Sequence, residues 1–529
     1  MEAKQIRVLV TDPLSKEGVA ILKNEGFEVE ETGKLTPAEL AGKVKGFDAL
    51  VVRSGTRVNR EAIAAADNLK VIGRAGVGLD NVDLESATAK GIIVMNSPEG
   101  NTISTAEHAF ALILSMMRNI PEAHHSVREG RWEKKGFTGT ELYRKVLGII
   151  GFGRIGQRVA QYGRVFGMEV LIYDPFVSEE KALQAGVNLV DQEHLLKNAD
   201  VITLHLPLSE ETRDLIGARE LALMKKGAFL VNCARGGLVN EPALIEALKS
   251  GHLKAAALDV FSEEPPADPA FRETPRLVLT PHLGASTEEA QVNVARDICR
   301  QIVDYFRKGI ISNAANLPTI SEKVLEYLRP YLNLCEKLGL FLAQTAPGRI
   351  NEVKLEYYGD MASFDLSPLH HSFLKGLLSQ MGAGVNYINA PVMAQERGIQ
   401  FAEQKSTISQ EFANLITATV SDSGSSISVS GTLFGKTEPR LVKIDGYRCE
   451  AVPEGYLLFC RNEDKPGIVG QIGTLLASRQ INIAGMTLGR KERGGLAITI
   501  LNVDEMVDEP LRERIRQIKE IKSVSLIKL

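Results

Sequence analysis

The chain has 529 residues, which at about 150 residues per domain corresponds to three or four domains. Charged residues make up 24% of it and hydrophobic residues 44%, as in ordinary globular proteins. The net charge of −4 excludes an overall basic field that would attract nucleic acid.

The cysteines and the N-terminus bear on location. The five cysteines are scattered without a C-x-x-C pair, which disfavours zinc and thioredoxin-like sites and fits a reducing compartment. The N-terminus enters a strand pattern with no signal-peptide core, and no apolar run is long enough to cross a bilayer. We therefore expect a cytoplasmic protein.

Short apolar runs alternate with amphipathic segments over the first hundred residues, which predicts a parallel sheet with helices on both faces. A mostly apolar helix, expected to be buried, follows over Thr102–Arg118. A second α/β series then has six expected strands, which predict a doubly wound nucleotide-binding sheet. The strands expected in the two series are Ile6–Val10, Ala49–Val52, Val71–Ile72 and Ile92–Met95, then Val146–Ile150, Val170–Tyr173, Val201–Leu204, Phe229–Asn232, Ala255–Leu258 and Leu277–Leu279.

The rest of the chain changes character. A helix over Ser286–Arg307 and a linker over Asn313–Thr319 precede a mixed region. That region has an expected helix over Ser321–Gln344, turns over Gly382–Val392, and then strands. From Gly455 onward the pattern is β-α-β-β-α-β, which predicts a ferredoxin-like module. The fold class is thus α/β with two doubly wound parallel-sheet domains, followed by an α+β domain and the ferredoxin-like domain.

A glycine-rich turn follows one of the expected strands. Gly151, Gly153 and Gly156 have the spacing at which the first permits a tight turn, the second lets backbone approach a pyrophosphate, and the third packs helix on strand. Asp174 ends the next strand, where a carboxylate can bind both ribose hydroxyls and would repel a 2′-phosphate. This context favours NAD over NADP, and the alternative is a structural turn with a solvated aspartate. Candidate cofactor contacts here also include Arg154 and Ile155.

Polar residues follow the ends of three later strands, where ligands bind in open α/β sheets. They are Arg235, Asp259 and His282, and Glu264 lies in the loop between the last two. A neutral imidazole can accept a hydroxyl proton, a carboxylate can orient it, and a guanidinium can hold a substrate carboxylate. Each residue alone could be an ordinary loop or surface residue, but together they indicate hydride transfer from an alcohol.

These motifs resemble the D-isomer-specific 2-hydroxyacid dehydrogenases over residues 1 to about 315. The resemblance rests on 151–156, Asn-Cys-Ala-Arg-Gly-Gly at 232–237, Ala-Leu-Asp-Val-Phe at 257–261 with Glu-Pro at 264–265, and Thr-Pro-His-Leu-Gly-Ala at 280–285. It implies that Arg235 binds the substrate carboxylate, that His282 is the acid/base, and that Glu264 is its partner. It implies cofactor contacts by Cys233, Ala234, Asp259, His282, Gly284 and Ala285.

The first sheet offers a possible anion site. Arg53 and Arg74 follow short strands and could bind a phosphate, and glycines 76 and 78 let backbone N–H groups approach it. The alternative is that both arginines pair with local acids. Candidate substrate contacts are Arg53, Ser54, Arg74, Gly76, Val77, Gly78, Asn101 and Arg235, with Lys134 and Lys135 as a further cationic segment that could equally be solvated surface.

Over its whole length the chain resembles the long-form D-3-phosphoglycerate dehydrogenases of this family, although position 77 is Val where some relatives carry Thr. The resemblance implies NAD-dependent oxidation of 3-phospho-D-glycerate to 3-phosphohydroxypyruvate, on the phosphorylated route to L-serine, by a homotetramer. It also implies a flavodoxin-like substrate domain at 1–98 and 286–318, a Rossmann domain at 99–285, an intervening regulatory domain of the allosteric substrate-binding type at 319–452, and an ACT domain at 453–529.

The terminal module resembles ACT domains, which bind amino acids. By that resemblance Asn462, Asp464 and Asn482 are candidate contacts for an effector such as L-serine, and the alternative is a purely structural assembly domain. The adjacent pairs His124-His125 and His370-His371 do not have the spacing of helical metal ligands, so no metal site is expected.

Two rival functions remain open. One is another enzyme of the family, such as a glycerate/hydroxypyruvate reductase, which would not need the arginine pair or the C-terminal 200 or so residues. The other is a non-enzymatic NAD-sensing corepressor, which can retain the same polar residues. No partner among nucleic acids or membranes is expected.

Overall fold

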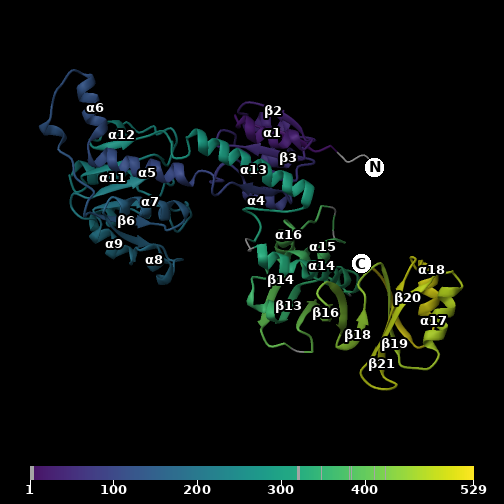
Figure 1. The fold of residues 1–529 in the computed structure, drawn as a ribbon. Coiled ribbons are helices and arrows are strands. Elements are labelled where there is room, and N and C mark those ends of the chain that lie inside the picture. Colours follow the sequence, from purple (N-terminus) through teal and green to yellow (C-terminus); the bar gives the residue numbers. More distant parts are fainter. Residues whose placement is uncertain are drawn as a thin grey trace.

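The computed structural model describes residues 5–318, 322–346, 348–380, 382, 384–409, 411–422 and 424–529. Four sheets with their helices form successive lobes (Figure 1). None of the helices in this described part of the chain combines the length and apolar character of a membrane span. All five cysteines are free thiols.

The first sheet is parallel, with strand order β2-β1-β3-β4-β5. This is the flavodoxin-like order. Its strands are β1 (Arg7–Val10), β2 (Glu28–Glu31), β3 (Ala49–Val52), β4 (Val71–Arg74) and β5 (Ile93–Asn96). Its helices are α1 (Lys16–Asn24), α2 (Pro37–Lys43), α3 (Arg60–Ala65) and α4 (Leu84–Ala89), and α13 (Glu288–Lys308) returns to it from far along the chain.

The packing of α13 explains how a discontinuous lobe forms. A Cβ atom at Gly18 of α1 would lie 2.8 Å from the Cβ of Ala295, so the glycine allows the two helices to touch. Ile298 of α13 packs closely over Gly73 of β4 in the same way. The two small residues therefore fix α13 on one face of the first sheet.

The second sheet is also parallel, with order β12-β11-β10-β9-β6-β7-β8. This is the Rossmann order with one extra strand, so the doubly wound prediction is confirmed. Its strands are β6 (Val146–Ile150), β7 (Glu169–Tyr173), β8 (Asn188–Leu189), β9 (Val201–Leu204), β10 (Phe229–Asn232), β11 (Ala255–Leu258) and β12 (Leu277–Leu279). Its helices are α5 (Thr102–Met117), α6 (Ile120–Arg128), η1 (Lys135–Phe137), α7 (Arg154–Val165), α8 (Glu179–Ala185), α9 (Gln192–Asn198), α10 (Ala218–Leu223), α11 (Glu241–Lys249) and α12 (Ala270–Glu273).

The third sheet is mixed, with order β14-β13-β15-β16-β17-β18. Its strands are β13 (Glu352–Gly359), β14 (Gln400–Ser406), β15 (Asn414–Ser421), β16 (Ser426–Phe434), β17 (Glu438–Ile444) and β18 (Tyr447–Ala451). The helical segments of this lobe are α14 (Glu322–Thr345), η2 (Asp360–Ser363), α15 (Ser367–Leu378) and α16 (Ala390–Glu396). The apolar faces of α14 and α15 share one core with the sheet.

The last sheet is antiparallel, with order β20-β21-β19-β22. It consists of β19 (Tyr456–Glu463), β20 (Ile483–Arg490), β21 (Leu496–Val503) and β22 (Ile521–Lys528), with helices α17 (Ile468–Ala477) and α18 (Glu509–Arg516). The ferredoxin-like prediction is confirmed.

Several sequence predictions need correction. Six strands were expected in the second sheet, and β8 makes a seventh; β2, β14 and β15 were also missed, as was helix α6. The expected turns over Gly382–Val392 give way to α16 from Ala390, where Pro391 suits the first turn of a helix. The expected linker is fixed to β5, since the Asn316 side chain bonds to Val94 N and Ile92 O. Thr319 and Ser321, in the linker and helix predictions, lie outside the described residues.

Candidate active site

The predicted acid/base pair is formed. His282 Nδ1 lies 2.8 Å from Glu264 Oε2, although the two residues come from different loops. His282 has a positive φ of +55°, and its N–H donates to Asp259 O at 2.9 Å. Non-glycine residues in this conformation are uncommon and often mark functional sites. The imidazole is half-exposed, so a substrate hydroxyl can reach its other nitrogen.

Arg235 lies at the end of β10 in a turn built from its own neighbours. Asn232 Nδ2 donates to Arg235 O at 2.8 Å, and Asn232 Oδ1 accepts from Ala234 N at 3.0 Å. The guanidinium reaches the first sheet, where its Nε lies 3.2 Å from Asp80 Oδ2. The Nη2 atom of Arg235 occupies the space that a Cβ atom on residue 78 would need, so the glycine at this position lets the guanidinium approach the backbone. Arg235 therefore contacts the loop that follows β4.

Asp259 fastens the loop that carries His282. Its buried carboxylate accepts from Leu283 N at 2.7 Å, Gly284 N at 2.9 Å and Thr280 Oγ1 at 2.6 Å. Burial raises the pKa of Asp259, but hydrogen bonds, first those from His108 and Thr280, outweigh it and leave the pKa below its usual value. Asp259, which was expected to contact the cofactor, thus also shapes the catalytic loop.

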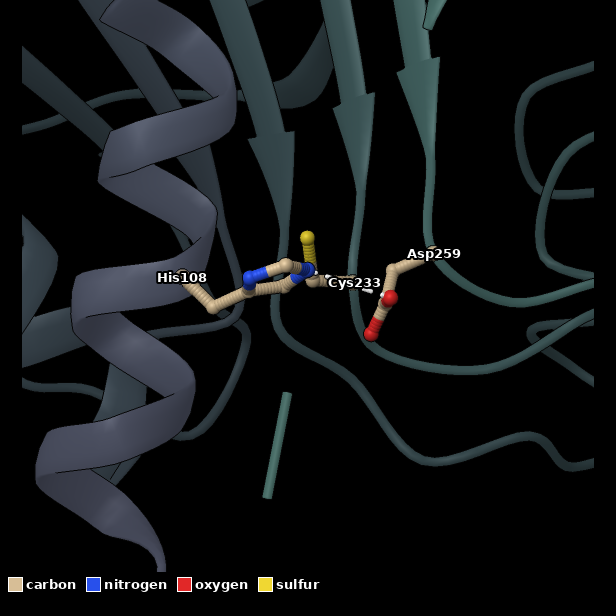
Figure 2. Close-up of side chains that lie close together, drawn as sticks. All are labelled: His108, Cys233 and Asp259. Carbon is tan, nitrogen blue, oxygen red and sulfur yellow. Dashed lines mark hydrogen bonds and ion pairs between the residues drawn. The ribbon is translucent and has the colours of Figure 1, made fainter. Parts of the chain in front are cut away.

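Figure 2 shows Asp259 beside His108 and Cys233, which the structure brings into one cluster. His108 Nε2 lies 3.1 Å from Asp259 Oδ1 and 3.2 Å from Thr280 Oγ1. Burial and the nearby Asp259 raise the pKa of Cys233 well above its usual value, so the thiol keeps its proton. Cysteine binds metals as a thiolate. His108, Asp259 and Thr280 form a hydrogen-bonded network, and the neutral Cys233 thiol lies beside it.

The glycine turn has the geometry that a pyrophosphate needs. Gly151 has φ of +94°, and a Cβ there would lie 2.5 Å from His205 O. A Cβ on Gly156 would lie 2.2 Å from Gly151 O, whereas nothing lies within 4 Å of the Cβ position at Gly153. The first and third glycines are thus required by packing, and the second leaves open space at the N-terminus of α7. The turn therefore fits NAD.

The other predicted cofactor residues surround this turn or the catalytic loop. Asp174 accepts from Phe152 N at 2.8 Å and Phe176 N at 2.9 Å, which ties the end of β7 to the glycine turn. Arg154 is exposed and pairs with Glu99 at 3.5 Å. Ile155, Ala234 and Ala285 are partly exposed, and Gly284 is buried against Asp259.

The predicted anion loop brings two arginines to one edge of the first sheet. Arg74 is largely buried, and its Nε has no hydrogen-bond partner among the described residues. Burial lowers its pKa to about 10, and the positive charges of Arg235 and Arg53 contribute to the shift. Arg53 donates to Pro13 O at 3.0 Å. Neither arginine forms an ion pair with a described acidic residue, although the charges of Asp80 and Asp12 partly offset the lowering of the Arg74 pKa.

The other predicted substrate contacts are smaller residues, most of which are neighbours of these arginines in the sequence. Gly76 has φ of +150°, and its Cβ position is filled by Arg74 Nη1. Val77 O accepts from Asn96 Nδ2 at 2.6 Å, which fixes the loop. Asn101 Oδ1 is buried without a hydrogen-bond partner among the described residues, and Ser54 is exposed. An orphaned buried oxygen is consistent with a polar ligand nearby.

Lys134 and Lys135 lie in an exposed arm. The arm contains α6 and η1 and projects from the second lobe (Figure 1). Lys134 Nζ lies 5.9 Å from the ring centre of Trp132, which is 76% exposed. No described contact joins these lysines to Arg53 or Arg74.

The predicted effector residues are engaged within the terminal lobe. Asn462 is buried, where it accepts from Thr499 Oγ1 at 2.9 Å and donates to Glu463 O at 2.8 Å. Asp464 pairs with Arg490 at 2.7 Å, and Asn482 Nδ2 donates to Asp504 at 2.7 Å. Their role in effector binding stays a prediction.

Sequence reasoning missed three residues that organise the site. Asp80 pairs with Arg235, His108 bonds to Asp259, and buried Asp12 accepts from Arg53 N and from the N–H and hydroxyl of Thr56. Asp12 offered a signal, since it lies two residues past the buried strand β1 and polar residues near strand ends often face a site. His108 was hidden in an apolar helix pattern.

Comparison with known proteins agrees with this geometry. Residues 110–284 match the NAD binding domain of the D-isomer specific 2-hydroxyacid dehydrogenases, residues 327–445 match the D-3-phosphoglycerate dehydrogenase intervening domain, and residues 456–520 match the ACT domain. Among solved structures, D-lactate dehydrogenase from Aquifex aeolicus, complexed with NAD and lactic acid, has a TM-score of 0.53 and 29% identity over 59% of this chain and 100% of its own.

Relatives that match over their full length identify a narrower group within this family. The D-3-phosphoglycerate dehydrogenase of Methanocaldococcus jannaschii is 46% identical over 99% of this chain and 100% of its own length. That of Bacillus subtilis is 41% identical over 99% of both. The cofactor is NAD. The chain belongs to the D-3-phosphoglycerate dehydrogenases, within the D-isomer-specific 2-hydroxyacid dehydrogenase family.

Proposed function

We propose that the chain catalyses the NAD-dependent oxidation of 3-phospho-D-glycerate to 3-phosphohydroxypyruvate, which opens the phosphorylated route to L-serine. The observation that carries this proposal is that Arg74 and Arg235 contact the loop after β4, with Arg53 near enough for its charge to lower the pKa of Arg74. A substrate with a carboxylate at one end and a phosphate at the other needs cations for both. The curated relatives of similar length carry the name of this enzyme.

His282 is suited to take the hydroxyl proton. If its Nδ1–H donates to Glu264, as the 2.8 Å contact indicates, Nε2 is left with a free lone pair. Nε2 accepts the proton of the C2 hydroxyl while the C2 hydrogen departs as a hydride, and the C–O bond becomes a carbonyl. When bound, NAD supplies the hydride acceptor. The Glu264 carboxylate then stabilises the imidazolium.

The three arginines are proposed to bind the two acidic groups of the substrate. Arg235 holds the substrate carboxylate and polarises the forming carbonyl, because its planar fork matches a carboxylate. Arg53 and Arg74 receive the phosphate. Lys134 and Lys135, in the projecting arm, are proposed to reach the site of a neighbouring subunit rather than that of their own chain.

Further features are proposed from the resemblance to this family. They include a homotetramer, a cytoplasmic location, and regulation by L-serine through Asn462, Asp464 and Asn482. They also include the division into a substrate domain (1–98 and 286–318), an NAD domain (99–285), an intervening domain (319–452) and an ACT domain (453–529).

The test is NAD-dependent turnover of 3-phosphoglycerate by the full chain and by His282→Ala. We expect the variant to lose roughly 10²- to 10⁴-fold in kcat, since proton transfer by a positioned side chain contributes about that much. Near-normal turnover by the variant would remove His282 from its role. No turnover by the unaltered chain would favour the NAD-sensing corepressor.

A further inference from the structure

A cavity lies in the third lobe, away from the proposed active site. Its volume is about 390 Å³, within the roughly 300 to 1,000 Å³ of typical small-molecule sites. Its polar lining groups come from α15 and α16 and are those of Ser367, His370, His371 and Gln395. The rest of the lining is apolar and includes Phe401, which is 39% exposed.

The polar residues of the lining are rich in hydrogen-bond acceptors. His371 Nδ1 lies 3.0 Å from the carbonyl oxygen of Tyr387, so this nitrogen carries the proton and Nε2 is an acceptor. The Ser367 hydroxyl donates to Asp365 at 2.6 Å, which leaves its lone pairs free. Burial lowers the pKa of both His370, to about 4, and His371, so both imidazoles are neutral near pH 7.

Charge and aromatic rings around the cavity favour a cation. No lysine or arginine is among the described residues that line it. Nearby Lys405 is already paired with Glu403, at 2.9 Å, and Glu403 lies 3.6 Å from His370 Nε2, which is buried without a hydrogen bond to any described residue. The His370 ring lies 4.8 Å from that of Phe401. Aromatic faces attract ammonium groups, and neutral imidazoles accept from them.

The cavity is connected to the substrate-binding lobe by a short turn at 386–389. His371 holds the carbonyl of Tyr387 in this turn, and Asn386 Nδ2 donates to Gly91 O at 2.8 Å. Ile388 is buried in the core of the first sheet. Helix α16, just after the turn, lies beside α4 (Figure 1).

Gly91 lies two residues before β5, which ends at the proposed substrate site. The side chain of Asn96, the last residue of β5, donates to Val77 O, and Ser97 N donates to Gly76 O at 2.9 Å. Contacts therefore run without interruption from His371, through the turn and β5, to the anion loop.

We propose that this cavity binds a small organic amine with an apolar body, and that its occupancy changes substrate affinity through the turn 386–389. The proposal that the cavity binds an amine is independent of the proposed function. The proposal that occupancy changes substrate affinity rests on the proposed function, because the effect is measured as a change in affinity for 3-phosphoglycerate.

Binding is tested on the full chain by isothermal titration with benzylamine, benzyl alcohol and benzoate, which share a ring and differ in charge. Benzylamine should bind about tenfold more tightly than benzyl alcohol, and benzoate should bind weakest. Two variants locate the site. His371→Phe removes the acceptor, and Ala394→Leu fills the cavity while both imidazoles are kept. Each should weaken benzylamine binding by roughly tenfold.

His125→Ala, at an exposed imidazole paired with Glu129, is the matched control and should bind benzylamine as the unaltered chain does. Benzoate binding at least as tightly as benzylamine would overturn the ligand class. Unchanged benzylamine binding by Ala394→Leu, folded as judged by its melting temperature, would overturn the site.

Coupling is tested by the dissociation constant of 3-phosphoglycerate with and without saturating benzylamine. We expect a change of at least about twofold in the unaltered chain. Asn386→Asp keeps the oxygen that organises the turn but cannot donate to Gly91, so it should bind benzylamine and lose the change. Persistence of the full change in Asn386→Asp, or no change in the unaltered chain, would overturn the coupling. The benzylamine titrations do not depend on turnover, so they test binding to the cavity even if the chain does not turn over 3-phosphoglycerate.

Discussion

The guanidinium of Arg235, at the end of β10, lies 3.2 Å from the carboxylate of Asp80, in the loop after β4. The contact joins the second sheet to the first across the proposed active site. Asp80 thus places a negative charge on the guanidinium that should receive the substrate carboxylate. The Asp80 side chain is 69% exposed, so the ion pair itself adds little stability.

Asp80→Asn should therefore lower KM for 3-phosphoglycerate, by roughly two- to fivefold, because it removes a competing charge from Arg235. Initial rates across substrate concentration measure this, and Asp83→Asn, at the cap of α4, controls for a nearby loss of charge. A raised KM in Asp80→Asn would show instead that Asp80 holds Arg235 in its productive position.

Glu264→Gln should keep a side chain of the same shape beside His282 while removing the charge that stabilises the imidazolium. We expect kcat to fall about 10²-fold with little change in KM, because the charge matters in the transition state. Steady-state kinetics distinguish these parameters, and Glu263→Gln, at the neighbouring acid, should leave kcat unchanged. Equal effects of the two substitutions would contradict the assignment of Glu264.

His108→Leu should weaken catalysis although His108 lies behind the catalytic loop. It removes a hydrogen-bond donor from Asp259, whose carboxylate holds Leu283 N and Gly284 N next to His282. A hydrogen bond to a charged group contributes about 1.5 to 3 kcal/mol, so kcat/KM should fall roughly tenfold or more. His108→Gln, which retains a donor, should recover part of the loss. Turnover by His108→Leu equal to that of the unaltered chain would refute this positioning role.

The buried His205 side chain should make the folded protein less stable at acidic pH. Its Nδ1 is buried without a hydrogen bond to any described residue, and burial lowers the pKa of His205 to about 4. Between pH 6.5 and about 4, His205 is protonated in the unfolded chain but neutral in the folded chain. The free energy of unfolding therefore keeps the whole His205 contribution above pH 6.5 and loses it as the pH falls.

From pH 7.5 to pH 5 the loss due to His205 should be about 2 kcal/mol. Thermal unfolding at the two pH values measures it, with His205→Gln expected to show a smaller loss because its amide does not titrate. An identical pH dependence in the variant would mean that folding leaves the pKa of His205 unchanged.

The parts of the fold and site that could be predicted are those with local signals. The glycine turn at 151–156 sets its own backbone geometry, and buried parallel strands such as β6 are continuous apolar runs. His282 and Glu264 each follow a strand end, so topology alone brings them to one edge. The short edge strands β2 and β8 lack such runs, since β2 reads Glu-Val-Glu-Glu and β8 has two residues.

Features that depend on contacts between distant lobes could not be read from the chain. Asp80 has no local reason to pair with Arg235, because the pairing depends on how the first and second sheets face each other. The turn at 386–389 reads as a surface loop until Asn386 is seen to donate to Gly91. Asn462 reads as a ligand contact, yet its side chain bonds within its own sheet.

The most direct test compares kcat/KM for 3-phosphoglycerate and for D-glycerate, with NAD, in the unaltered chain and in Arg53→Ala. Arg53 is proposed to bind the phosphate that only one of these substrates carries. We expect the unaltered chain to prefer 3-phosphoglycerate, and Arg53→Ala to lose roughly 10- to 100-fold on that substrate alone, the value of a charge-assisted hydrogen bond. Equal use of both substrates by the unaltered chain, or equal losses on both in the variant, would contradict the assignment of a phosphorylated substrate.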